Sequence, residues 1–442
     1  MTFQDAQRYL DSLGVDLMRS RPPSLHRMEA ICAALDHPER SIPAIHITGT
    51  NGKSSVARLA TAVLASTGLS VGTYTSPHLD SVRERIALSG EPLSEDAFGT
   101  AFDHFFPYLQ VVEKELGERL SYFEVLTALF FLWAAEAPVD SLVVEVGLGG
   151  LWDATNVVDA PVAVVTNVAL DHMSFLGDTP EAIAAEKAGI IKKGSAVVTA
   201  ERSPSTLSVI GNEAEAKGAS VAVLERDFRL EENRVAFGGR YLTLVTSAGR
   251  HEGVFLSLHG AHQGANAAVA LEASARFLGG RALDADVVAE AFVSASVPGR
   301  LETVNPRGSD GPTVVMDVAH NPHGMSALVS SLLDAFAFER VNFVVGVLSD
   351  KDYGGMLAEL TRVPCTLTLT RPRNVRSVPT EDLEAAAARL GFETRTAPSV
   401  AAATEAAIDT ASPGDLVCVT GSNYVVGEVR ARLVADANPG GG

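Results

Sequence analysis

Short, almost wholly apolar segments rich in valine, isoleucine and threonine alternate with longer amphipathic segments along the first half of the chain. The apolar segments are expected to be strands, at residues 44–48, 70–75, 141–146, 161–168 and 195–199. Helix-like stretches lie between them, for example at residues 55–67, 123–137 and 180–191. Strands that are apolar along their whole length and alternate with helices are typical of a parallel sheet covered on both faces. The pattern therefore predicts a doubly wound α/β domain.

The pattern changes between residues 224 and 258, where short alternating strands are separated by glycine turns. This stretch predicts a small antiparallel layer attached to the first domain. After a helical stretch at 266–278 comes a linker candidate, Ser296-Val297-Pro298-Gly299-Arg300. The α/β rhythm then restarts, with strands expected at 313–318, 342–348, 366–370 and 415–420 and helices at 380–390 and 400–411. We therefore expect two domains, residues 1–296 and a smaller, Rossmann-like α/β domain at residues 300–442.

Composition narrows the possible partners. The 442 residues are 46% hydrophobic and 20% charged, which suits two domains with large buried cores. A formal net charge of −19 argues against nonspecific binding to nucleic acid or an anionic membrane. An acidic chain that binds an anion must supply local cations, helix N-termini or metal ions.

Cysteine usage and the start of the chain bear on its compartment. The three cysteines are scattered without a C-x-x-C pair, and the first residues lack the cationic and apolar regions of a signal peptide. No segment approaches the roughly 20 uncharged apolar residues of a membrane span. We expect a protein of the reducing cytoplasm, without a membrane partner.

The strand expected at 44–48 runs into a glycine-rich loop and then a helix, through Gly49-Thr50-Asn51-Gly52-Lys53-Ser54-Ser55. Glycines let the backbone N–H groups face a phosphate, the helix N-terminus adds partial positive charge, and Lys53 adds a full charge. The complete phosphate-loop pattern would also have glycine where this chain has Ile47. A glycine turn alone needs no ligand, but the strand–loop–helix context with Gly-Lys-Ser favours phosphate binding. The first domain is therefore expected to be of the P-loop type.

Polar residues follow the expected strands beside this loop. Glu145 ends an apolar strand just before a glycine turn, and a buried carboxylate there needs either backbone N–H partners or a metal ion. Ser76 and His172 would ordinarily be turn or capping residues, and Lys187 a surface lysine beside Glu186. Together at successive strand ends and helices, they favour a Mg²⁺ site, because Mg²⁺ needs few protein ligands and takes the rest from phosphate and water.

With these motifs in hand, the chain resembles the folylpolyglutamate synthase/dihydrofolate synthase family of the Mur ligase superfamily. The resemblance covers nearly the whole chain. Its motifs, in order, are residues 46–55, Thr75-Ser76-Pro77-His78-Leu79, Ser121-Tyr122-Phe123-Glu124, 145–150 with Asp153-Ala154-Thr155-Asn156, Leu170-Asp171-His172, 186–191, Gly260-Ala261-His262-Gln263 with Asn266, Pro298-Gly299-Arg300-Leu301-Glu302, Asp317-Val318-Ala319-His320-Asn321-Pro322 and Asp350-Lys351-Asp352.

The resemblance implies an ATP-dependent ligase that adds L-glutamate to a folate or dihydropteroate through an acyl phosphate, acting as a monomer. The β- and γ-phosphates of ATP would be held by Gly49, Thr50, Asn51, Gly52, Lys53, Ser54 and Ser55. Ser76 and Glu145 would hold one Mg²⁺, and His172 with a carbamylated Lys187 a second. A carbamate is required there because an ammonium group cannot ligate a metal.

The resemblance also assigns the remaining positions. ATP would be bound between the two domains by Asn266, Arg300 and Asp317, with Arg300 on phosphate. The pterin side would be lined by Ser121, Phe123 and Asp153. Incoming glutamate would be bound by His320, Lys351 and Ser422. The residues expected to act in catalysis are Lys53, His172, Lys187 and Arg300.

Two positions depart from the family pattern. Leu151 stands where the family usually has arginine, which suggests altered handling of the pterin or its carboxylate, and Ser54 stands where many members have glycine. Two alternatives therefore stay open: a Mur-type ligase acting on another carboxylate, and a nucleotide-binding homologue that has lost catalysis. The short stretch before the phosphate loop argues against a nucleotide-sugar substrate, and the retained Lys53, Lys187 and Arg300 argue against lost catalysis.

Overall fold

The computed structural model describes residues 1–14, 24–308, 311–412 and 414–437. It divides into two compact units. Unit 1 comprises residues 1–232, 242–255 and 265–295, and unit 2 comprises residues 233–241, 256–264 and 296–442. None of the described helices carries an apolar stretch long enough to cross a bilayer.

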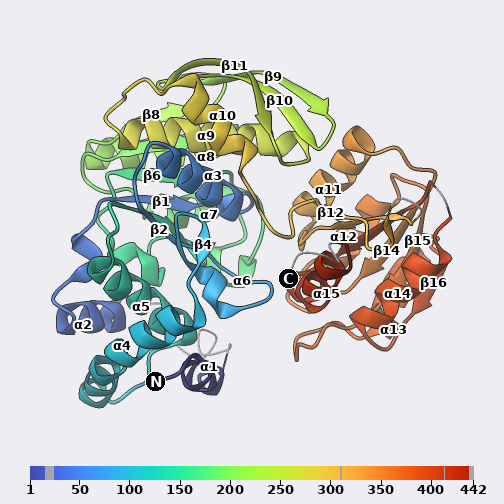
Figure 1. Ribbon diagram of the computed structural model, residues 1–442, viewed down its shortest axis with the longest axis horizontal. Helices are drawn as coiled ribbons and strands as arrows, with labels where there is room; N and C mark the ends of the chain where they lie inside the picture. The colour runs from blue at the N-terminus through green and yellow to red at the C-terminus, as the bar shows by residue number, and fades with distance from the viewer. Residues whose placement is uncertain (15–23, 309–310, 413, 438–442) are drawn as a thin grey trace. The chain divides into compact units, whose positions relative to one another are not determined.

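Unit 1 is built on an eight-stranded sheet in the order β4-β3-β2-β5-β1-β6-β7-β8 (Figure 1). Its strands are β1 (Ala44–Thr48), β2 (Val71–Tyr74), β3 (Ile86–Leu88), β4 (Glu91–Pro92), β5 (Ser141–Glu145), β6 (Val162–Val165), β7 (Ala196–Thr199) and β8 (Ser220–Val223). The strands from β2 to β8 in this order are parallel, and β3 and β4 add an antiparallel edge that the apolar pattern did not predict. The register pairs Ile47 with Glu145, so β1 and β5 end side by side.

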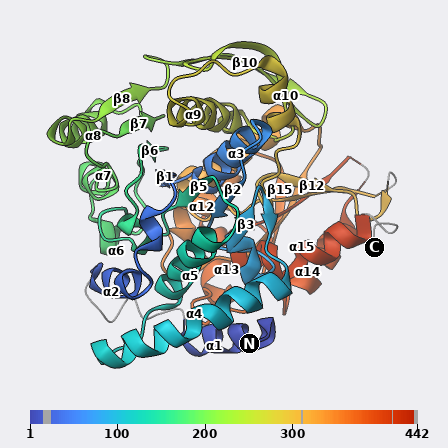
Figure 2. The same ribbon diagram turned by 60° about the vertical axis from the view of Figure 1, so that its left-hand side comes forward.

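Helices surround this sheet and pack on one another, as the two views in Figures 1 and 2 show. They are α1 (Phe3–Ser12), α2 (His26–Ala34), α3 (Lys53–Ser66), α4 (Glu95–Leu116), α5 (Tyr122–Glu136), α6 (Met173–Leu176), α7 (Pro180–Ala188), α8 (Pro204–Lys217), α9 (Ala261–Phe277) and α10 (Ala285–Val293). The three strands β9 (Arg229–Ala236), β10 (Gly239–Thr246) and β11 (Gly249–Leu256) form a separate small sheet. The predicted doubly wound fold with an additional small strand layer is confirmed.

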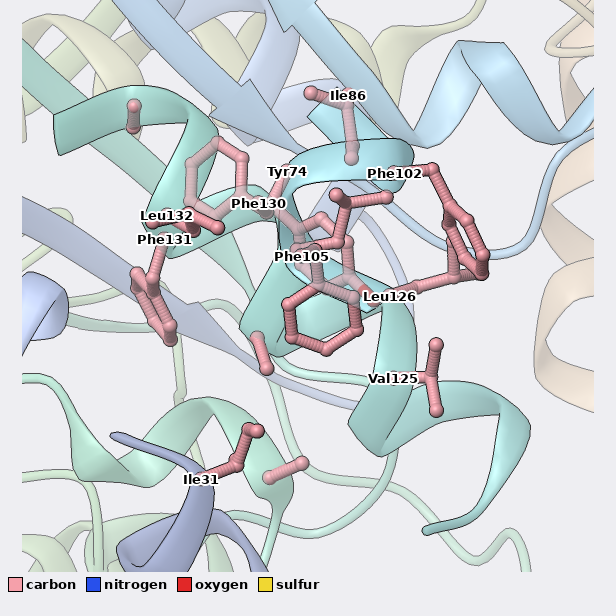
Figure 3. Close-up of a cluster of buried hydrophobic side chains, with 14 of the residues drawn as sticks. Ile31, Tyr74, Ile86, Phe102, Phe105, Val125, Leu126, Phe130, Phe131 and Leu132 are labelled. Atoms are coloured by element: carbon pink, nitrogen blue, oxygen red, sulfur yellow. The ribbon is translucent and has the colours of Figure 1, made fainter. Parts of the chain in front are cut away.

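An aromatic core holds α1, α2, α4 and α5 against β2 and β5 (Figure 3). Tyr74 stacks on Phe130 with ring centroids 5.2 Å apart, and Phe102 meets Phe105 edge to face at 6.2 Å. A second apolar cluster packs residues of β6 and β7 against those of α7 and α8. Side chains of this size dominate the burial that stabilises a sheet–helix interface. The helix α5 is therefore fixed firmly, and its first turn carries residues of the candidate site.

Unit 2 has a six-stranded sheet in the order β12-β13-β17-β14-β15-β16. Its strands are β12 (Glu302–Val304), β13 (Thr313–Met316), β14 (Val341–Val345), β15 (Cys365–Leu369), β16 (Thr394–Thr396) and β17 (Leu416–Thr420). Its helices are α11 (Pro322–Ala335), α12 (Tyr353–Leu360), α13 (Thr380–Arg389), α14 (Val400–Thr410) and α15 (Asn423–Ala437). All strands are parallel except β12, and the α/β domain expected at the end of the chain is confirmed.

Candidate active site

The phosphate loop joins β1 to α3 in the expected place. Gly52 caps the helix in a left-handed conformation (φ 83°), and a Cβ there would lie 2.7 Å from Asn266 Oδ1. Lys53 Nζ donates to the carbonyl oxygens of Gly49 and Thr50, at 3.0 and 3.2 Å. The ammonium group is therefore held against the loop at a helix N-terminus, where an anion is stabilised.

The segment after β6 braces this loop, which the sequence did not indicate. Asn167 Oδ1 accepts from the Asn51 amide at 3.1 Å, and Thr166 Oγ1 donates to the Asn51 carbonyl at 2.6 Å. Gly49 passes so close that a Cβ there would lie 1.7 Å from Thr166 Oγ1. No local sequence pattern could have indicated these contacts, since the partners are more than a hundred positions from the loop in sequence.

Glu145 links the phosphate loop to the end of β2. It is 1% exposed, and its two oxygens accept from Ser54 Oγ at 2.8 Å and from the Ser76 amide at 3.0 Å. The hydroxyl of Ser54, which stands where the family often has glycine, therefore has a defined partner. The structure brings Ser76 and Glu145 together beside the loop, as the sequence predicted.

Lys187 lies at the end of α7 and is 3% exposed. Burial, together with the positive charge of Lys53, lowers the pKa of Lys187 to about 7. The carboxylate of Asp171 opposes this shift and raises the pKa of Lys187. His172 Nε2 lies 3.9 Å from Asp171 Oδ1. Lys53 and Asp171 are thus each close enough to Lys187 to influence its charge.

The oxygen donors around Glu145 suit a magnesium ion. No group of three or more His, Cys, Asp or Glu residues that could hold a metal by itself occurs in the described parts of the chain. Mg²⁺ does not need such a group, because one carboxylate and a hydroxyl, with substrate phosphates and water, can complete its shell. The buried carboxylate of Glu145 beside the hydroxyl-bearing Ser54 and Ser76 provides such a donor set.

A pocket of about 220 Å³ opens next to Glu145, and we call it the α5 pocket. It is lined by Gly14, Ser76, Pro77, Arg85, Ser121, Tyr122, Phe123, Gly147, Leu148 and Asp153. The three residues expected on the pterin side, Ser121, Phe123 and Asp153, are therefore brought together. Ser76 belongs both to this pocket and to the Glu145 contact, so the pocket adjoins the phosphate loop.

The walls of the α5 pocket are apolar apart from a few polar groups. Phe123 lies against Gly147, where an added Cβ would be 2.5 Å from the ring. Arg85, which the sequence did not single out, adds a cation to the lining; its guanidinium lies 5.2 Å from the Tyr122 ring centroid, and its Nε donates to His78 Nδ1 at 3.0 Å. Such a pocket suits a flat, partly apolar ligand with an acidic end.

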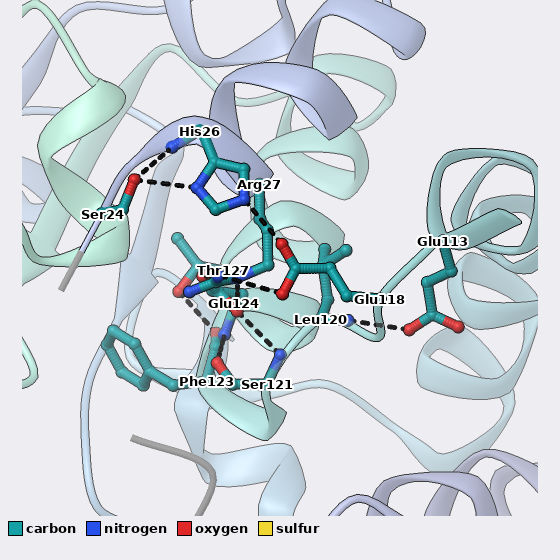
Figure 4. A network of polar contacts seen from close by, with 10 residues as sticks. All are labelled: Ser24, His26, Arg27, Glu113, Glu118, Leu120, Ser121, Phe123, Glu124 and Thr127. Atoms are coloured by element: carbon teal, nitrogen blue, oxygen red, sulfur yellow. Dashed lines mark hydrogen bonds and ion pairs between the residues drawn. The ribbon is translucent and has the colours of Figure 1, made fainter. Parts of the chain in front are cut away.

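An ion-pair network anchors the wall of this pocket (Figure 4). Arg27 Nε donates to both oxygens of the buried Glu124, at 2.9 and 3.1 Å. Glu124 also accepts from the amide of Ser121, whose side chain in turn caps α5. Arg27 thereby ties α2 to the turn of α5 that carries Ser121 and Phe123.

In unit 2, Asp317 holds the turn that presents Arg300. Its carboxylate oxygens accept from the amides of Leu301 and Ala319, both at 2.9 Å. Burial raises the pKa of Asp317, while the charge of Arg300 opposes that shift. Leu301 adopts a left-handed conformation (φ 50°) and is 1% exposed, so the turn is fixed on both sides of Arg300.

The residues expected to bind glutamate follow neighbouring strands of unit 2. His320 comes after β13, Ser422 after β17 and Lys351 after β14, and these strands are adjacent in the order β13-β17-β14. His320 Nδ1 lies 2.9 Å from the Val318 carbonyl, and the buried Ser422 Oγ accepts from the Val425 amide at 3.2 Å. The carboxyl ends of parallel strands are where ligands bind in such sheets.

Comparison with known proteins shows the family of the chain. The model of the Mur ligase middle domain matches residues 47–274, and the model of the Mur ligase glutamate ligase domain matches residues 299–423. A dihydrofolate synthase/folylpolyglutamate synthase from Mycobacterium tuberculosis is 40% identical over 386 residues, which cover 83% of this chain and 77% of that protein.

Solved structures give the same result. A folylpolyglutamate synthase from Mycobacterium tuberculosis complexed with ADP has a TM-score of 0.91 at 37% identity, with 98% of each chain covered. Escherichia coli FolC in complex with DHPP and ADP has a TM-score of 0.84 at 31% identity, again with 98% of each chain covered. The resemblance seen in the sequence is confirmed, and the chain belongs to the Mur ligase family, within its group of folylpolyglutamate and dihydrofolate synthases.

Proposed function

We propose that this enzyme, an ATP-dependent ligase that adds L-glutamate to a folate, activates its substrate where the phosphate loop meets the α5 pocket. The observation that carries the proposal is the position of Ser76. The Ser76 amide donates to Glu145, which also accepts from Ser54, the neighbour of Lys53 in the phosphate loop. Ser76 itself lines the α5 pocket. A folate seated in the pocket would thus direct its carboxylate at the γ-phosphate of ATP.

The chemistry then proceeds in two steps. The substrate carboxylate attacks the γ-phosphorus, and the bond to ADP breaks to leave an acyl phosphate. The amine of glutamate attacks the acyl carbon, phosphate leaves, and the amide forms with loss of a proton. Lys53 and the loop amides stabilise the charge that spreads over the phosphoryl oxygens during the first step. We assign Arg300 to the same phosphate charge, and His320, Lys351 and Ser422 to the glutamate.

Magnesium would be held at two places, by Ser76 with Glu145 and by His172 with Lys187. The ion would neutralise phosphate charge and help orient the γ-phosphoryl group. For the second place we propose a carbamate on Lys187, formed when its neutral amine adds to CO₂ and releases a proton. The proposal is supported by the burial of Lys187 and by its position beside Lys53 and Asp171.

The test is ADP release by the purified full-length chain with ATP, Mg²⁺ and glutamate, in parallel with dihydropteroate, with tetrahydrofolate and without a pterin. We expect at least one pterin to stimulate ADP release and to gain a glutamyl residue by mass spectrometry. The comparison of the two pterins assigns dihydrofolate synthesis, polyglutamate extension or both. Stimulation by neither pterin would overturn the folate assignment, and nucleotide binding without any turnover would indicate a homologue that has lost catalysis.

A further inference from the structure

A buried histidine next to the phosphate loop has no part in the chemistry described so far. His46 lies on β1, three residues before Gly49, and is fully buried. Its Nε2 lies 2.8 Å from Thr155 Oγ1. Thr155 is also fully buried and follows Asp153, which lines the α5 pocket.

The available donors and acceptors indicate the direction of these hydrogen bonds. Thr155 Oγ1 donates its single hydrogen to Asp153 Oδ1 at 2.5 Å, so the same oxygen accepts from His46 Nε2. His46 therefore carries a proton on Nε2, and because burial lowers its pKa to about 3, the ring is neutral. Its Nδ1 is buried without a hydrogen-bond partner among the described residues, an arrangement that costs stability.

Asp153, at the far end of this series of hydrogen bonds, fixes the pocket wall. Asp153 Oδ1 also accepts from the Thr155 amide at 3.0 Å, and Oδ2 accepts from the Leu148 amide at 3.0 Å. Both Leu148 and Asp153 line the α5 pocket. Thr48, on the same face of β1 as His46, donates to the Gly149 carbonyl at 2.6 Å, so this strand face contacts the same segment twice.

We propose that His46 is a positioning residue for the folate pocket, acting through Thr155 to fix the Asp153 carboxylate and the Leu148 backbone at the pocket wall. The inference rests on the proposed function, because it takes the α5 pocket as the folate site. It differs from support of the phosphate loop, which His46 could also give as a neighbour in sequence. The two roles predict effects on different substrates.

The experiment measures KM for tetrahydrofolate and KM for ATP in four variants: Thr155→Val, His46→Leu, His46→Gln and the double variant of the first two. Loss of one hydrogen bond in the chain should raise KM for the folate about fivefold and leave KM for ATP unchanged. His46→Gln keeps an N–H donor directed at Thr155 and should stay close to the wild type. Because Thr155 is the only link described between His46 and Asp153, the double variant should match Thr155→Val alone.

Thr61→Val is the matched control. Thr61 is a buried threonine of unit 1 whose hydroxyl lies 2.6 Å from Thr73 Oγ1, and neither residue lines the α5 pocket. The substitution Thr61→Val removes a comparable buried hydrogen bond and should lower the thermal midpoint of unfolding without changing KM for the folate. The inference is overturned if His46→Leu and Thr155→Val raise KM for ATP instead, act independently in the double variant, or behave like Thr61→Val. If the wild type itself shows no pterin-dependent turnover, the proposed function fails rather than this role of His46.

Discussion

The buried ion pair between α2 and α5 gives the most quantitative prediction. Side chains of Arg27 and Glu124 are only 9% and 8% exposed, and they lie 97 positions apart in sequence. Replacing Arg27 with methionine keeps the apolar stem but leaves the Glu124 carboxylate buried without its cation. Removal of one partner from a buried pair typically costs about 3–5 kcal/mol.

The local contacts place this case at the lower end of that range. Glu124 keeps the hydrogen bond from the Ser121 amide, at 2.7 Å, which stabilises part of its charge. The second contact of Arg27, to Glu118 at 3.5 Å, adds little because the Glu118 side chain is 29% exposed. We therefore expect Arg27→Met to lower the free energy of unfolding of unit 1 by about 3 kcal/mol. With a urea slope of about 3 kcal/mol/M, the midpoint should fall by about 1 M.

Tryptophan fluorescence can follow this transition because both tryptophans of the chain, Trp133 and Trp152, belong to unit 1. Arg226→Met is the matched control, since Arg226 is 62% exposed and pairs with the neighbouring Asp227 on the surface. Its removal should change stability by no more than about 0.5 kcal/mol. Equal midpoints for Arg27→Met and Arg226→Met would refute the reasoning, because the pair would then contribute no more than a surface contact.

Three further substitutions test the phosphate site by steady-state ADP release. Gly49→Ala should lower turnover about a hundredfold, because its Cβ would lie 1.7 Å from Thr166 Oγ1 and displace the loop. Gly211→Ala on α8 is the control and should be neutral, since there is open space around Gly211. Equal rates for the two variants would contradict the close approach at Gly49. Lys187→Ala should nearly abolish turnover, with partial rescue by a small carboxylic acid, and full activity without rescue would exclude its role. Arg300→Ala should lower kcat more than the affinity for ATP, and an unchanged kcat would exclude a role in stabilising transition-state charge.

The sequence predicted those parts of the molecule that local patterns determine. Strand β1, the loop and helix α3 follow from an apolar run, two glycines and the Gly-Lys-Ser motif, and the helix begins only two residues before the expected 55–67. Glu145 and Ser76 could be placed together because parallel strands bring their carboxyl ends to one edge. The strand order, with β5 between β2 and β1, was needed to show that they touch.

Pairings between distant segments could not be predicted from the sequence. Arg85 and Ser121 line one pocket although neither segment carries a pattern that indicates the other. Arg27 falls in a weakly amphipathic helix, and only the fold shows that its charge is buried against Glu124. Such contacts depend on which helices pack together, and residue periodicity specifies a buried face but not the partner that covers it.

The side chain of Leu151, which departs from the family pattern, is not what holds its own loop in place. The backbone of Leu151 is held at both ends, by donation to the Glu186 carbonyl at 2.9 Å and by acceptance from Asn156 Nδ2 at 2.8 Å. Gly189 leaves room for it, since a Cβ at that glycine would lie 2.5 Å from Leu151 Cβ. The two hydrogen bonds use only backbone atoms of Leu151, which an arginine would also provide, and the side chain itself is 54% exposed. Exchange between arginine and leucine therefore leaves the loop in place and changes only the group presented beside Asn156 and Glu186, from a cation to an apolar side chain. The cation among the residues that line the α5 pocket is Arg85, which is held by His78 and Tyr122, and we expect it rather than position 151 to meet an acidic ligand.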